Sequence, residues 1–596
     1  MKNRIAQLLA DATNKLHQDG LLPEPVDSNS ISIERARDNS HGDFASNLAM
    51  TLAKKAKRKP RDLAEALVTA LVVDLAADDS IEKVEIAGPG FINFFLKLAS
   101  LNQVIGKVLS AGSDYGRSQA GKGQKILLEY VSANPTGPLH VGHGRGAAYG
   151  SALAKLLDFT GHQVEQEYYV NDAGRQMDIL ATSIWLRYLE AGGVELTFPR
   201  AGYKGDYIRD LAAQLRQQHG NQFEHSNAVV FADQPEDEGH PDDASETTSG
   251  NKEAHIDGLI VRAKQLLQEN YATVHGHGKD VIVADIREDL SEFKVNYTTW
   301  FEESSLVASG AVKRAFDQLN EAGHLYQRDG AWWFRSTTFG DQKDRVVIRE
   351  NGEPTYFATD IAYHLQKLER GFNQLTDIWG SDHHGYVPRV KAAISALNQD
   401  PERLEVLLVQ FAVLYRGDQK MSMSTRSGEF VTLRELRNEV GSDATRFFYL
   451  MHKSDQHMEF DLELAKSNSN DNPVFYVQYA HARICSVLRQ LADSDRQLDQ
   501  VKSNYELLVE PQEQNLIALL DRFPELIENS ARKHEPHTLT YYLRELANGL
   551  HSYYNAHQFL VDDEILCCSR LELIRAVKIV LVSGLDLLGV GAPESM

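Results

Sequence analysis

The feature that most constrains this chain is a strand, a turn and a helix that follow one another directly. Residues 125–132 (KILLEYVS) are apolar enough for a buried strand, and residues 134–138 (NPTGP) have the composition of a turn. The helix after the turn is rich in small residues and ends near Gly161. This order is typical of the first unit of a parallel α/β sheet. We therefore predict an α/β fold with further strands at 163–170, 375–380 and 404–411.

A long insertion is expected to divide this sheet, because the second and third predicted strands are far apart in the sequence. We predict that it covers about residues 175–340. Within it, residues 219–255 are polar and carry nine acidic residues and one basic residue from position 220 onward. Such a composition predicts a disordered surface loop. The alternative is an acidic segment that binds a partner.

The two ends of the chain have different patterns. Residues 1–115 are predicted to form a small α+β domain, with helices at 1–17 and 44–56 and a strand pair within 84–96. From residue 455 to 596, apolar residues recur every three or four positions, which predicts a helical bundle. Its helices are expected at 472–489, 514–530, 537–555 and 571–588. The 596 residues thus divide into predicted domains at 1–115, 116–454 and 455–596.

Composition excludes several classes of protein. The three cysteines, Cys485, Cys567 and Cys568, are too few for a disulfide scaffold or a four-cysteine metal site, which favours a reducing, cytosolic setting. No apolar run approaches the 18 or so residues of a membrane helix. The net charge of −22 argues against a nucleic-acid partner, but residues 54–61 hold six basic residues in eight positions. That run is either a solvated helix end or a surface that binds a polyanion.

The segment 134–144 (NPTGPLHVGHG) carries the strongest chemical signal. A helix that starts after a strand directs free N–H groups at the space above the sheet, which favours phosphate. His140 and His143 lie three residues apart on one face of the first turns, so both can donate to phosphate oxygens as charge develops. Gly142, Gly144 and Gly146 leave room for a flat ligand. The alternatives are a structural histidine pair or a zinc site completed by His383 and His384.

A second glycine-containing segment lies at residues 419–430 (QKMSMSTRSGEF). Its Met-Ser pairs, its basic residues and its glycine are consistent with a mobile loop that closes on a triphosphate through Lys420 or Arg426. Taken alone, the segment is better explained as an ordinary surface loop.

In this order, split by an insertion and followed by a helical bundle, the two segments resemble the two signatures of class I aminoacyl-tRNA synthetases. The remaining motifs are similar to those of the arginyl-tRNA synthetase family. They are residues 129–138 (EYVSANPTGP), 168–174 (YYVNDAG), 339–344 (FGDQKD), 355–360 (TYFATD), 380–385 (GSDHHG) and 472–483 (NPVFYVQYAHAR). The resemblance covers nearly the whole chain apart from the acidic segment.

The resemblance implies a Rossmann-type class I catalytic domain, a small N-terminal α+β domain that touches tRNA and an all-α anticodon-binding bundle. It implies ATP, Mg²⁺ carried by ATP, L-arginine and tRNA(Arg) as ligands, without a protein-held metal, DNA or a membrane. A cytoplasmic monomer is expected.

The resemblance and the residue chemistry together give candidate site residues. Catalytic candidates are His140, His143, Lys420, Ser424 and Arg426. ATP candidates are Pro138, His140, Gly142, His143, Gly380, Asp382, His383 and Met423. Arginine candidates are Glu129, Ser132, Asn134, Tyr356 and Asp360, since a guanidinium needs carboxylate partners. Candidates for tRNA are Lys54, Lys55, Arg58, Tyr479, His481 and Arg483.

One position departs from the family pattern. The second signature commonly has a lysine directly after Met-Ser, and Thr425 occupies that position when the segment is aligned through Gly428. The charge that stabilises the triphosphate must therefore come from Arg426, Lys420 or Lys125, among which the sequence does not choose.

Three alternatives remain open at this point. The first is a class I synthetase for another amino acid, such as glutamine or cysteine. The second is a nucleotidyltransferase that acts on a small molecule, which would not need a helical bundle. The third is a catalytically impaired paralogue that binds tRNA, which the Thr425 departure keeps open.

Overall fold

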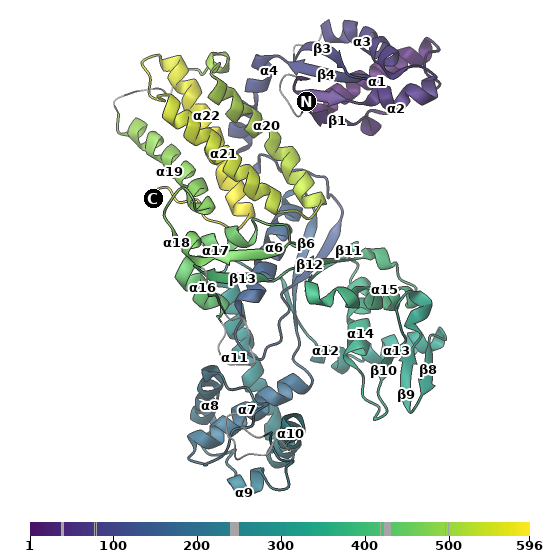
Figure 1. The fold of residues 1–596 in the computed structure, drawn as a ribbon, viewed down its shortest axis with the longest axis vertical. Helices are drawn as coiled ribbons and strands as arrows, with labels where there is room; N and C mark the ends of the chain where they lie inside the picture. Colours follow the sequence, from purple (N-terminus) through teal and green to yellow (C-terminus); the bar gives the residue numbers. More distant parts are fainter. Residues whose placement is uncertain are drawn as a thin grey trace.

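The computed structural model describes residues 1–36, 41–76, 78, 80–238, 250–417, 419–421, 431–494, 496, 498 and 500–596. Figure 1 shows an N-terminal domain, a central α/β body with two appended lobes and a C-terminal helical bundle. Within these residues, no helix combines the length and the apolar character needed to cross a membrane.

The centre of the molecule is a sheet of five parallel strands in the order β12–β11–β5–β6–β7. The strands are β5 (Lys125–Tyr130), β6 (Gln163–Val170), β7 (Thr299–Glu302), β11 (Gln374–Gly380) and β12 (Leu404–Val409). From β5 the chain builds the sheet in one direction to β7, and then in the other direction from β11. Open α/β sheets bind ligands beyond the carboxyl ends of the strands at such a reversal.

The prediction of one insertion over 175–340 is wrong, because β7 returns the chain to the sheet in the middle of it. Strand β7 is only four residues long and has no alternation that marks it in the sequence. The part before β7 is helical, with α7 (Arg175–Ala191), α8 (Asp206–His219), α9 (Asn227–Val230), α10 (Lys252–Leu267) and α11 (Asn270–Glu292). After β7 come α12 (Ser304–Ala308), α13 (Ala311–Glu321) and an antiparallel sheet of β8 (Leu325–Arg328), β9 (Ala331–Phe334) and β10 (Arg345–Ile348). Helices α14 (Tyr356–Glu369) and α15 (Val387–Ala396) then flank β11 along the chain.

The prediction that residues 219–255 are disordered is wrong for part of this segment. Phe223 and Val230 are fully buried, and the segment is bounded by the end of α8 and the start of α10. Residues 239–249 lie outside the described part of the chain. Helix α9 sits at the end of the molecule opposite the N-terminal domain (Figure 1), so the described acidic residues do not lie between the two terminal domains.

Helix α6 (Val141–Phe159) follows β5 and is buried on nearly all sides. It contacts β5, β6 and β11, the helices α16 (Leu433–Val440) and α17 (Ser442–Tyr449), and two helices of the bundle. Its glycines allow these close approaches. A Cβ atom at Gly150 would lie 2.4 Å from the Tyr130 ring, and one at Gly144 would lie 2.8 Å from the Tyr449 ring.

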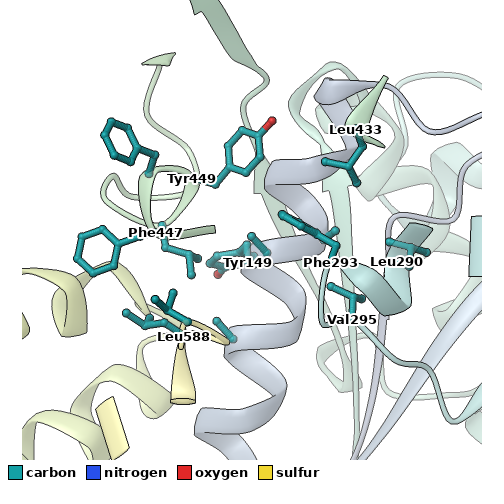
Figure 2. Packing of buried hydrophobic residues seen from close by; sticks show 14 of the residues in the cluster. Tyr149, Leu290, Phe293, Val295, Leu433, Phe447, Tyr449 and Leu588 are labelled. Carbon is teal, nitrogen blue, oxygen red and sulfur yellow. The ribbon is translucent and has the colours of Figure 1, made fainter. Parts of the chain in front are cut away.

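A buried arginine joins the catalytic body to the bundle. Arg446, on α17, donates from Nε to the Leu588 carbonyl at 2.9 Å, from Nη1 to the Phe293 carbonyl at 2.8 Å and from Nη2 to Ser151 Oγ at 2.6 Å. Leu588 directly follows α22, Phe293 directly follows α11, and Ser151 lies on α6. Figure 2 shows the apolar side chains packed at this junction, including Tyr149 and Phe447.

The bundle contains the four predicted helices, α19 (Pro473–Ala492), α20 (Pro511–Arg532), α21 (His537–Ala556) and α22 (Glu564–Leu587). It begins later than the predicted residue 455. Before it, β13 (Ala412–Arg416), β14 (Gln419–Lys420) and β15 (Met458–Asp461) form a small sheet, and α18 (Leu462–Lys466) follows. Because β15 pairs with β13, this part of the chain belongs to the central body.

The N-terminal domain is an antiparallel sheet with the strand order β1–β2–β4–β3, covered by helices. Its elements are α1 (Lys2–Gln18), β1 (Ile33–Arg35), β2 (Phe44–Ser46), α2 (Leu48–Ala56), α3 (Pro60–Ala76), β3 (Ile81–Ala87) and β4 (Phe91–Leu96). The predicted helix at 44–56 starts only at Leu48, because the preceding residues pair as β2. Helices α4 (Leu98–Asn102) and α5 (Val104–Ala111) lead to the sheet, and the Lys2–Glu525 and Arg35–Asp521 ion pairs tie the domain to α20.

Substituting Gly150→Ala should destabilise the protein, because the added methyl group would overlap the buried Tyr130 ring. Overpacking of this kind costs about 1–3 kcal/mol. Gly146→Ala, on the same helix, is the matched control, since nothing lies within 4 Å of its added Cβ. Because alanine has a higher helix propensity than glycine, this control substitution should stabilise the folded protein by up to about 1 kcal/mol. Urea midpoints that move equally in both variants would contradict this account of α6.

Candidate active site

A cavity of about 450 Å³ lies beyond the carboxyl ends of β5, β6, β11 and β12. It is therefore located at the strand-order reversal of the sheet. Eight predicted site residues line it: Ser132, Asn134, His140, Gly142, His143, Gly380, Asp382 and His383. Segments separated by more than 230 residues thus meet at one cavity. Predicted Pro138 is partly buried in the turn before α6 and does not line the cavity.

The rings of His140 and His143 lie against each other at the start of α6, with centroids 3.7 Å apart and planes tilted by 31°. The backbone N–H of Gly142 donates to His140 Nδ1 at 3.0 Å, and the backbone N–H of His140 donates to His143 Nδ1 at 3.3 Å. Because both Nδ1 atoms accept, each neutral ring carries its proton on Nε2. The helix start thus fixes the tautomer that makes Nε2 a hydrogen-bond donor.

Both rings are neutral at pH 7. Burial lowers the pKa of His140, while burial and the neighbouring His140 lower the pKa of His143 to about 3. The pair therefore offers N–H donors to an anion without a permanent positive charge. A phosphate that develops charge next to them would gain most from donors of this kind.

Two glycines and an aromatic ring shape the cavity between the histidines and β11. A Cβ at Gly142 would lie 3.2 Å from the Phe411 ring, and one at Gly380 would lie 3.3 Å from it. Phe411 follows β12, is 40% exposed and lines the larger cavity. Sequence reasoning missed Phe411 and Trp379, because an isolated aromatic residue at a strand end carries no distinguishing pattern.

A buried arginine holds the segment that carries Phe411. Arg145, on α6, donates from Nη1 to the carbonyls of Gln410 and Gln456 at 2.8 Å, and from Nη2 to the carbonyl of Lys453 at 2.8 Å. Burial lowers its pKa to about 10, so it remains cationic at neutral pH. Its role was not visible in the sequence, since it depends on three carbonyls from distant segments.

A second cavity of about 230 Å³ is lined by Asn134, Asn171, Ala173, Gln176 and Tyr356. It adjoins the first, because Asn134 and Asn171 line both. Asn134 Nδ2 donates to Gln176 Oε1 at 2.7 Å. Asn171 and Gln176 were not among the predicted site residues, although Asn171 lies inside a quoted motif.

Four carboxyl groups gather around the Tyr169 side chain behind these cavities: Glu129, Asp172, Glu303 and Asp360. Tyr386 donates its hydroxyl hydrogen to Asp360, and no Lys or Arg of the described chain pairs with that carboxylate. Burial raises the pKa of Asp360, and burial raises the pKa of Glu303 to about 7. Lys367 pairs with Glu129 and Lys279 lies 3.8 Å from Asp172, whereas Asp360 and Glu303 have no lysine or arginine partner among the described residues. Buried carboxyl groups of this kind favour a bound cation.

Tyr356 and Asp360 lie one turn apart at the start of α14, as the four-residue spacing predicted. Tyr356 is 51% exposed and lines the second cavity. Its hydroxyl approaches Gly174, where a Cβ would lie 2.8 Å away, and Gly174 has a φ of +85°, which favours glycine.

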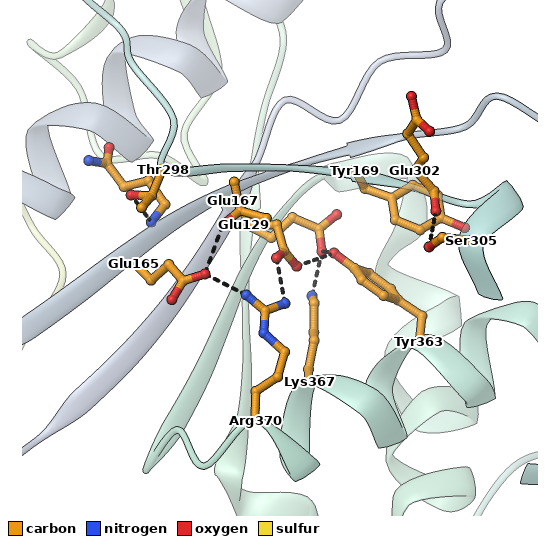
Figure 3. A network of polar contacts seen from close by, with 12 residues as sticks. Glu129, Glu165, Glu167, Tyr169, Thr298, Glu302, Ser305, Tyr363, Lys367 and Arg370 are labelled. Carbon is orange, nitrogen blue, oxygen red and sulfur yellow. Dashed lines mark hydrogen bonds and ion pairs between the residues drawn. The ribbon is translucent and has the colours of Figure 1, made fainter. Parts of the chain in front are cut away.

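Glu129, by contrast, is buried and already has internal partners. Its Oε1 accepts from Ser132 Oγ at 2.9 Å, and its Oε2 accepts from Tyr363 OH at 2.8 Å and from Lys367 Nζ. Figure 3 shows Tyr363, Lys367 and Arg370 reaching from α14 to the carboxylates of β5 and β6. A contact between Glu129 and a ligand is part of the proposed function below.

Three family models match the chain in succession. They are an arginyl tRNA synthetase N-terminal domain at residues 2–96, a class I (R) tRNA synthetase catalytic domain at 104–195 and 255–470, and a DALR anticodon binding domain at 477–596. The chain belongs to the arginyl-tRNA synthetase family. Much of the acidic segment falls in the gap of the catalytic model.

Curated relatives agree along the full length. The chain is 56% identical to an arginine–tRNA ligase of Thioalkalivibrio sulfidiphilus, 55% to one of Hydrogenovibrio crunogenus and 52% to one of Legionella pneumophila, with full coverage of both chains in each comparison. Among solved structures, a putative arginyl tRNA synthetase from Campylobacter jejuni matches with a TM-score of 0.72 and 31% identity, covering 84% of this chain and all of that one. The Thermus thermophilus arginyl-tRNA synthetase has the same fold, with a TM-score of 0.72 at 22% identity over both full chains.

The predicted second signature of this synthetase lies outside the described part of the chain. Ser424, Arg426 and Met423 fall within residues 422–430, of which nothing structural is stated. Lys420 is described and lies exposed on β14, opposite Tyr415 of β13. The choice among Lys420, Arg426 and Lys125 therefore stays a prediction.

The predicted tRNA-contact residues differ in their accessibility. Lys54, Lys55 and Arg58 are exposed at the end of α2 and in the turn to α3. The prediction for His481 is wrong, since this residue is 2% exposed and its Nδ1 lies 2.8 Å from the Pro593 carbonyl, which leaves no surface for RNA. It faces inward from α19 toward the C-terminal tail.

Tyr479 and Arg483 instead form a partly exposed aromatic and basic cluster on the bundle. The Arg483 guanidinium lies 4.5 Å from the Tyr479 ring centroid and 4.7 Å from that of Tyr554, and Phe475 stacks with Tyr479. The periodicity of α19 placed Tyr479 and Arg483 on one face, but it did not reveal Tyr554 from α21.

The depressed pKa of His143 predicts a pH dependence of stability. In the unfolded chain a histidine binds a proton near pH 6.5, whereas the folded His143 stays neutral until about pH 3. The unfolded state therefore binds more protons below pH 6.5, and stability falls as the pH falls through that range. His143→Gln removes this contribution, so its stability should fall less than that of the parent between pH 7 and pH 5.

Denaturant unfolding at several pH values measures this difference. His384→Gln, at an exposed position of the same cavity region, is the control and should retain the parent's pH dependence. An unchanged pH dependence in His143→Gln would rule out a buried neutral His143.

Proposed function

We propose that this chain joins L-arginine to tRNA(Arg) in two steps. The arginine carboxylate attacks the α-phosphate of ATP, which gives arginyl-adenylate and pyrophosphate. The terminal 2′-hydroxyl of the tRNA then attacks the adenylate, which gives arginyl-tRNA and AMP. The observation that carries this proposal is the pair of adjoining cavities, one beside the histidine pair and one beside the buried carboxyl cluster, joined through Asn134.

ATP would occupy the larger cavity. Gly142 and Gly380 leave a slot beside Phe411 that fits a flat adenine, and Asp382 is exposed there to accept from ribose hydroxyls. The Nε2–H groups of His140 and His143 would donate to phosphate oxygens as charge moves to the leaving pyrophosphate. Residues 420–428 are the proposed source of further positive charge on the pyrophosphate.

Mg²⁺ is proposed to arrive on the phosphates of ATP. Among the described residues, no three His, Cys, Asp or Glu side chains are grouped so as to hold a metal ion. The chain's own contribution to the chemistry is therefore positioning and hydrogen-bond donation.

Arginine would place its guanidinium at Asp360 and Tyr356, with Glu129 and Ser132 beside them. Its α-amino and carboxylate groups would then lie toward Asn134, which borders the ATP cavity. A planar guanidinium can meet carboxylates with two parallel hydrogen bonds. Lysine cannot reproduce this geometry, and uncharged citrulline would leave buried negative charge uncompensated.

The tRNA is proposed to contact both terminal domains. Lys54, Lys55 and Arg58 offer an exposed positive surface on the N-terminal domain. Tyr479 and Arg483 offer an aromatic and basic surface on the bundle, which suits unstacked anticodon bases. We place the enzyme in the cytoplasm, where its three substrates meet, and expect a monomer.

The alternatives are weakened for physical reasons. A synthetase for glutamine or cysteine would not need several buried carboxyls around its amino-acid pocket. A nucleotidyltransferase for small molecules would not need the bundle. An impaired paralogue would be expected to lose the histidine geometry, which is intact here.

Charging of bulk bacterial tRNA with each of the twenty radiolabelled amino acids tests the function. Arginine alone should become attached, and His143→Ala should lower the rate by about 10²–10³-fold, the scale of losing one transition-state donor. This variant shows that the activity belongs to the purified chain. Charging with another amino acid, or none, would refute the proposal.

Two aspartates should separate the substrate sites. Asp360→Asn should raise the KM for arginine at least about 10-fold with little change in the KM for ATP, because a charge-assisted bond contributes roughly 1.5–3 kcal/mol. Asp382→Asn should raise the KM for ATP and leave the KM for arginine nearly unchanged. Arginine-dependent charging at varied substrate concentrations measures both constants. Equal effects on both KM values in either variant would contradict the assigned site.

A further inference from the structure

Lys367 is a fully buried lysine whose charge is held by two carboxylates. It points from α14 toward the sheet, as Figure 3 shows, and its Nζ donates to Glu129 Oε2 of β5 and, at 2.9 Å, to Asp377 Oδ1 of β11. These two strands flank the strand-order reversal. Lysines are very rarely buried completely, so its position points to a specific use of the charge.

The contacts of Glu129 show what that use is. A carboxylate has about four hydrogen-bond acceptor positions. Three of those of Glu129 are taken by Lys367, Tyr363 and Ser132. Tyr363 OH also lies 2.7 Å from Glu167 Oε1, so the two carboxylates share its single hydrogen. The carboxylate is therefore fixed in orientation, and Ser132, on its other oxygen, lies in the wall of the larger cavity.

We propose that Lys367 is a positioning residue for arginine recognition: it fixes the orientation of Glu129 and offsets its charge, so that Asp360 keeps its negative charge for the guanidinium. This inference rests on the proposed function. Lys367 does not touch the substrate. It acts through Glu129, to which it is bonded, and through the charge that it places near Asp360.

The electrostatics of the cluster support this role. Without a nearby cation, two carboxylates close together in a buried site cannot both remain ionised. Burial is the main cause that raises the pKa of Asp360, and Glu129 raises it further. The Tyr386 hydrogen bond, His364 and Lys367 lower it. Lys367 itself remains protonated, since its carboxylate partners outweigh its burial. The charged and titratable groups around Glu129 are Glu167, Tyr169, Tyr297, Asp360, Tyr363, His364, Lys367, Arg370 and Asp377.

A neighbouring ion pair provides a matched control. Arg370 lies three residues after Lys367 on α14 and donates to Glu167 Oε2 and Glu165 Oε1, each at 2.5 Å. It belongs to the same network but does not contact Glu129 or Asp377. Losing it should disturb the outer edge of the network while leaving the arginine-binding carboxylates in place.

The test compares Lys367→Met, Lys367→Arg and Arg370→Met in arginine charging between pH 6 and pH 8. Lys367→Met should raise the KM for arginine at least 10-fold and leave the KM for ATP within about 2-fold of the parent. Without the cation the pKa of Asp360 should rise, so this KM should increase further as the pH falls. Lys367→Arg should restore much of the parent behaviour, and Arg370→Met should show neither effect.

A double variant keeps the test decisive if Lys367→Met does not fold. Lys367→Met/Glu129→Gln removes one of the two buried carboxylate charges that Lys367 offsets. The other carboxylate, Asp377, keeps His364 as a neighbour, with Nε2 at 3.0 Å from Asp377 Oδ2. The KM for arginine of the double variant should be high, but it should increase less toward low pH than that of Lys367→Met. If Lys367→Met is insoluble, Lys367→Gln takes its place in this comparison.

The outcomes distinguish this inference from the proposed function. If the parent chain does not charge tRNA with arginine, the proposed function fails. If the parent charges arginine but Lys367→Met matches Arg370→Met, or raises both KM values equally, only the role of Lys367 is overturned. A rise in the KM for arginine that does not depend on pH would also overturn it.

Discussion

The structure depends on one buried helix. Helix α6 begins at the histidine pair, runs beneath the five-stranded sheet and contacts the bundle, so catalytic geometry and domain assembly share a single element. This is possible only because its residues are small where neighbours approach, as at Gly144 and Gly150. Close packing then extends to Arg446, which is bonded to α6, to the end of α11 and to the end of α22. A movement of the bundle would therefore also displace α6, which begins at the histidine pair.

The site divides its electrostatics between two adjoining regions. Around His140 and His143 the protein offers neutral donors, because burial and backbone hydrogen bonds keep both rings unprotonated. Around Tyr169 it gathers carboxyl groups, of which Glu129 pairs with Lys367 and Asp172 lies 3.8 Å from Lys279. In the proposed function, the triphosphate lies at the histidine end and the arginine side chain at the carboxyl end, with Asn134 between them. The amino acid is then proposed to lie with its carboxylate toward the larger cavity.

Charge distribution also resolves a conflict that the composition raised. A net charge of −22 argues against RNA as a partner, yet the chain belongs to a family of tRNA ligases. Part of the negative charge lies in the segment around α9, remote from the N-terminal domain, and part is paired with cations inside the catalytic body, as with Lys367 and Arg370. Neither group faces the exposed basic residues at the end of α2. The net charge of a chain thus predicts an RNA partner poorly when many of its carboxylates lie away from the RNA-binding surface.

The sequence by itself determined the sheet strands β5, β6, β11 and β12, the four bundle helices, and the histidine and aspartate motifs of the site, because each has a local pattern or a family signature. It missed β7, whose four residues carry no periodicity, and it placed His481 on the RNA surface because spacing along α19 does not say which face is covered by the C-terminal tail. Only the tertiary structure decided the partners of buried charges. Lys367, Arg145 and Arg446 look like ordinary surface residues in the sequence, and their roles exist only where distant strands and carbonyls converge on them.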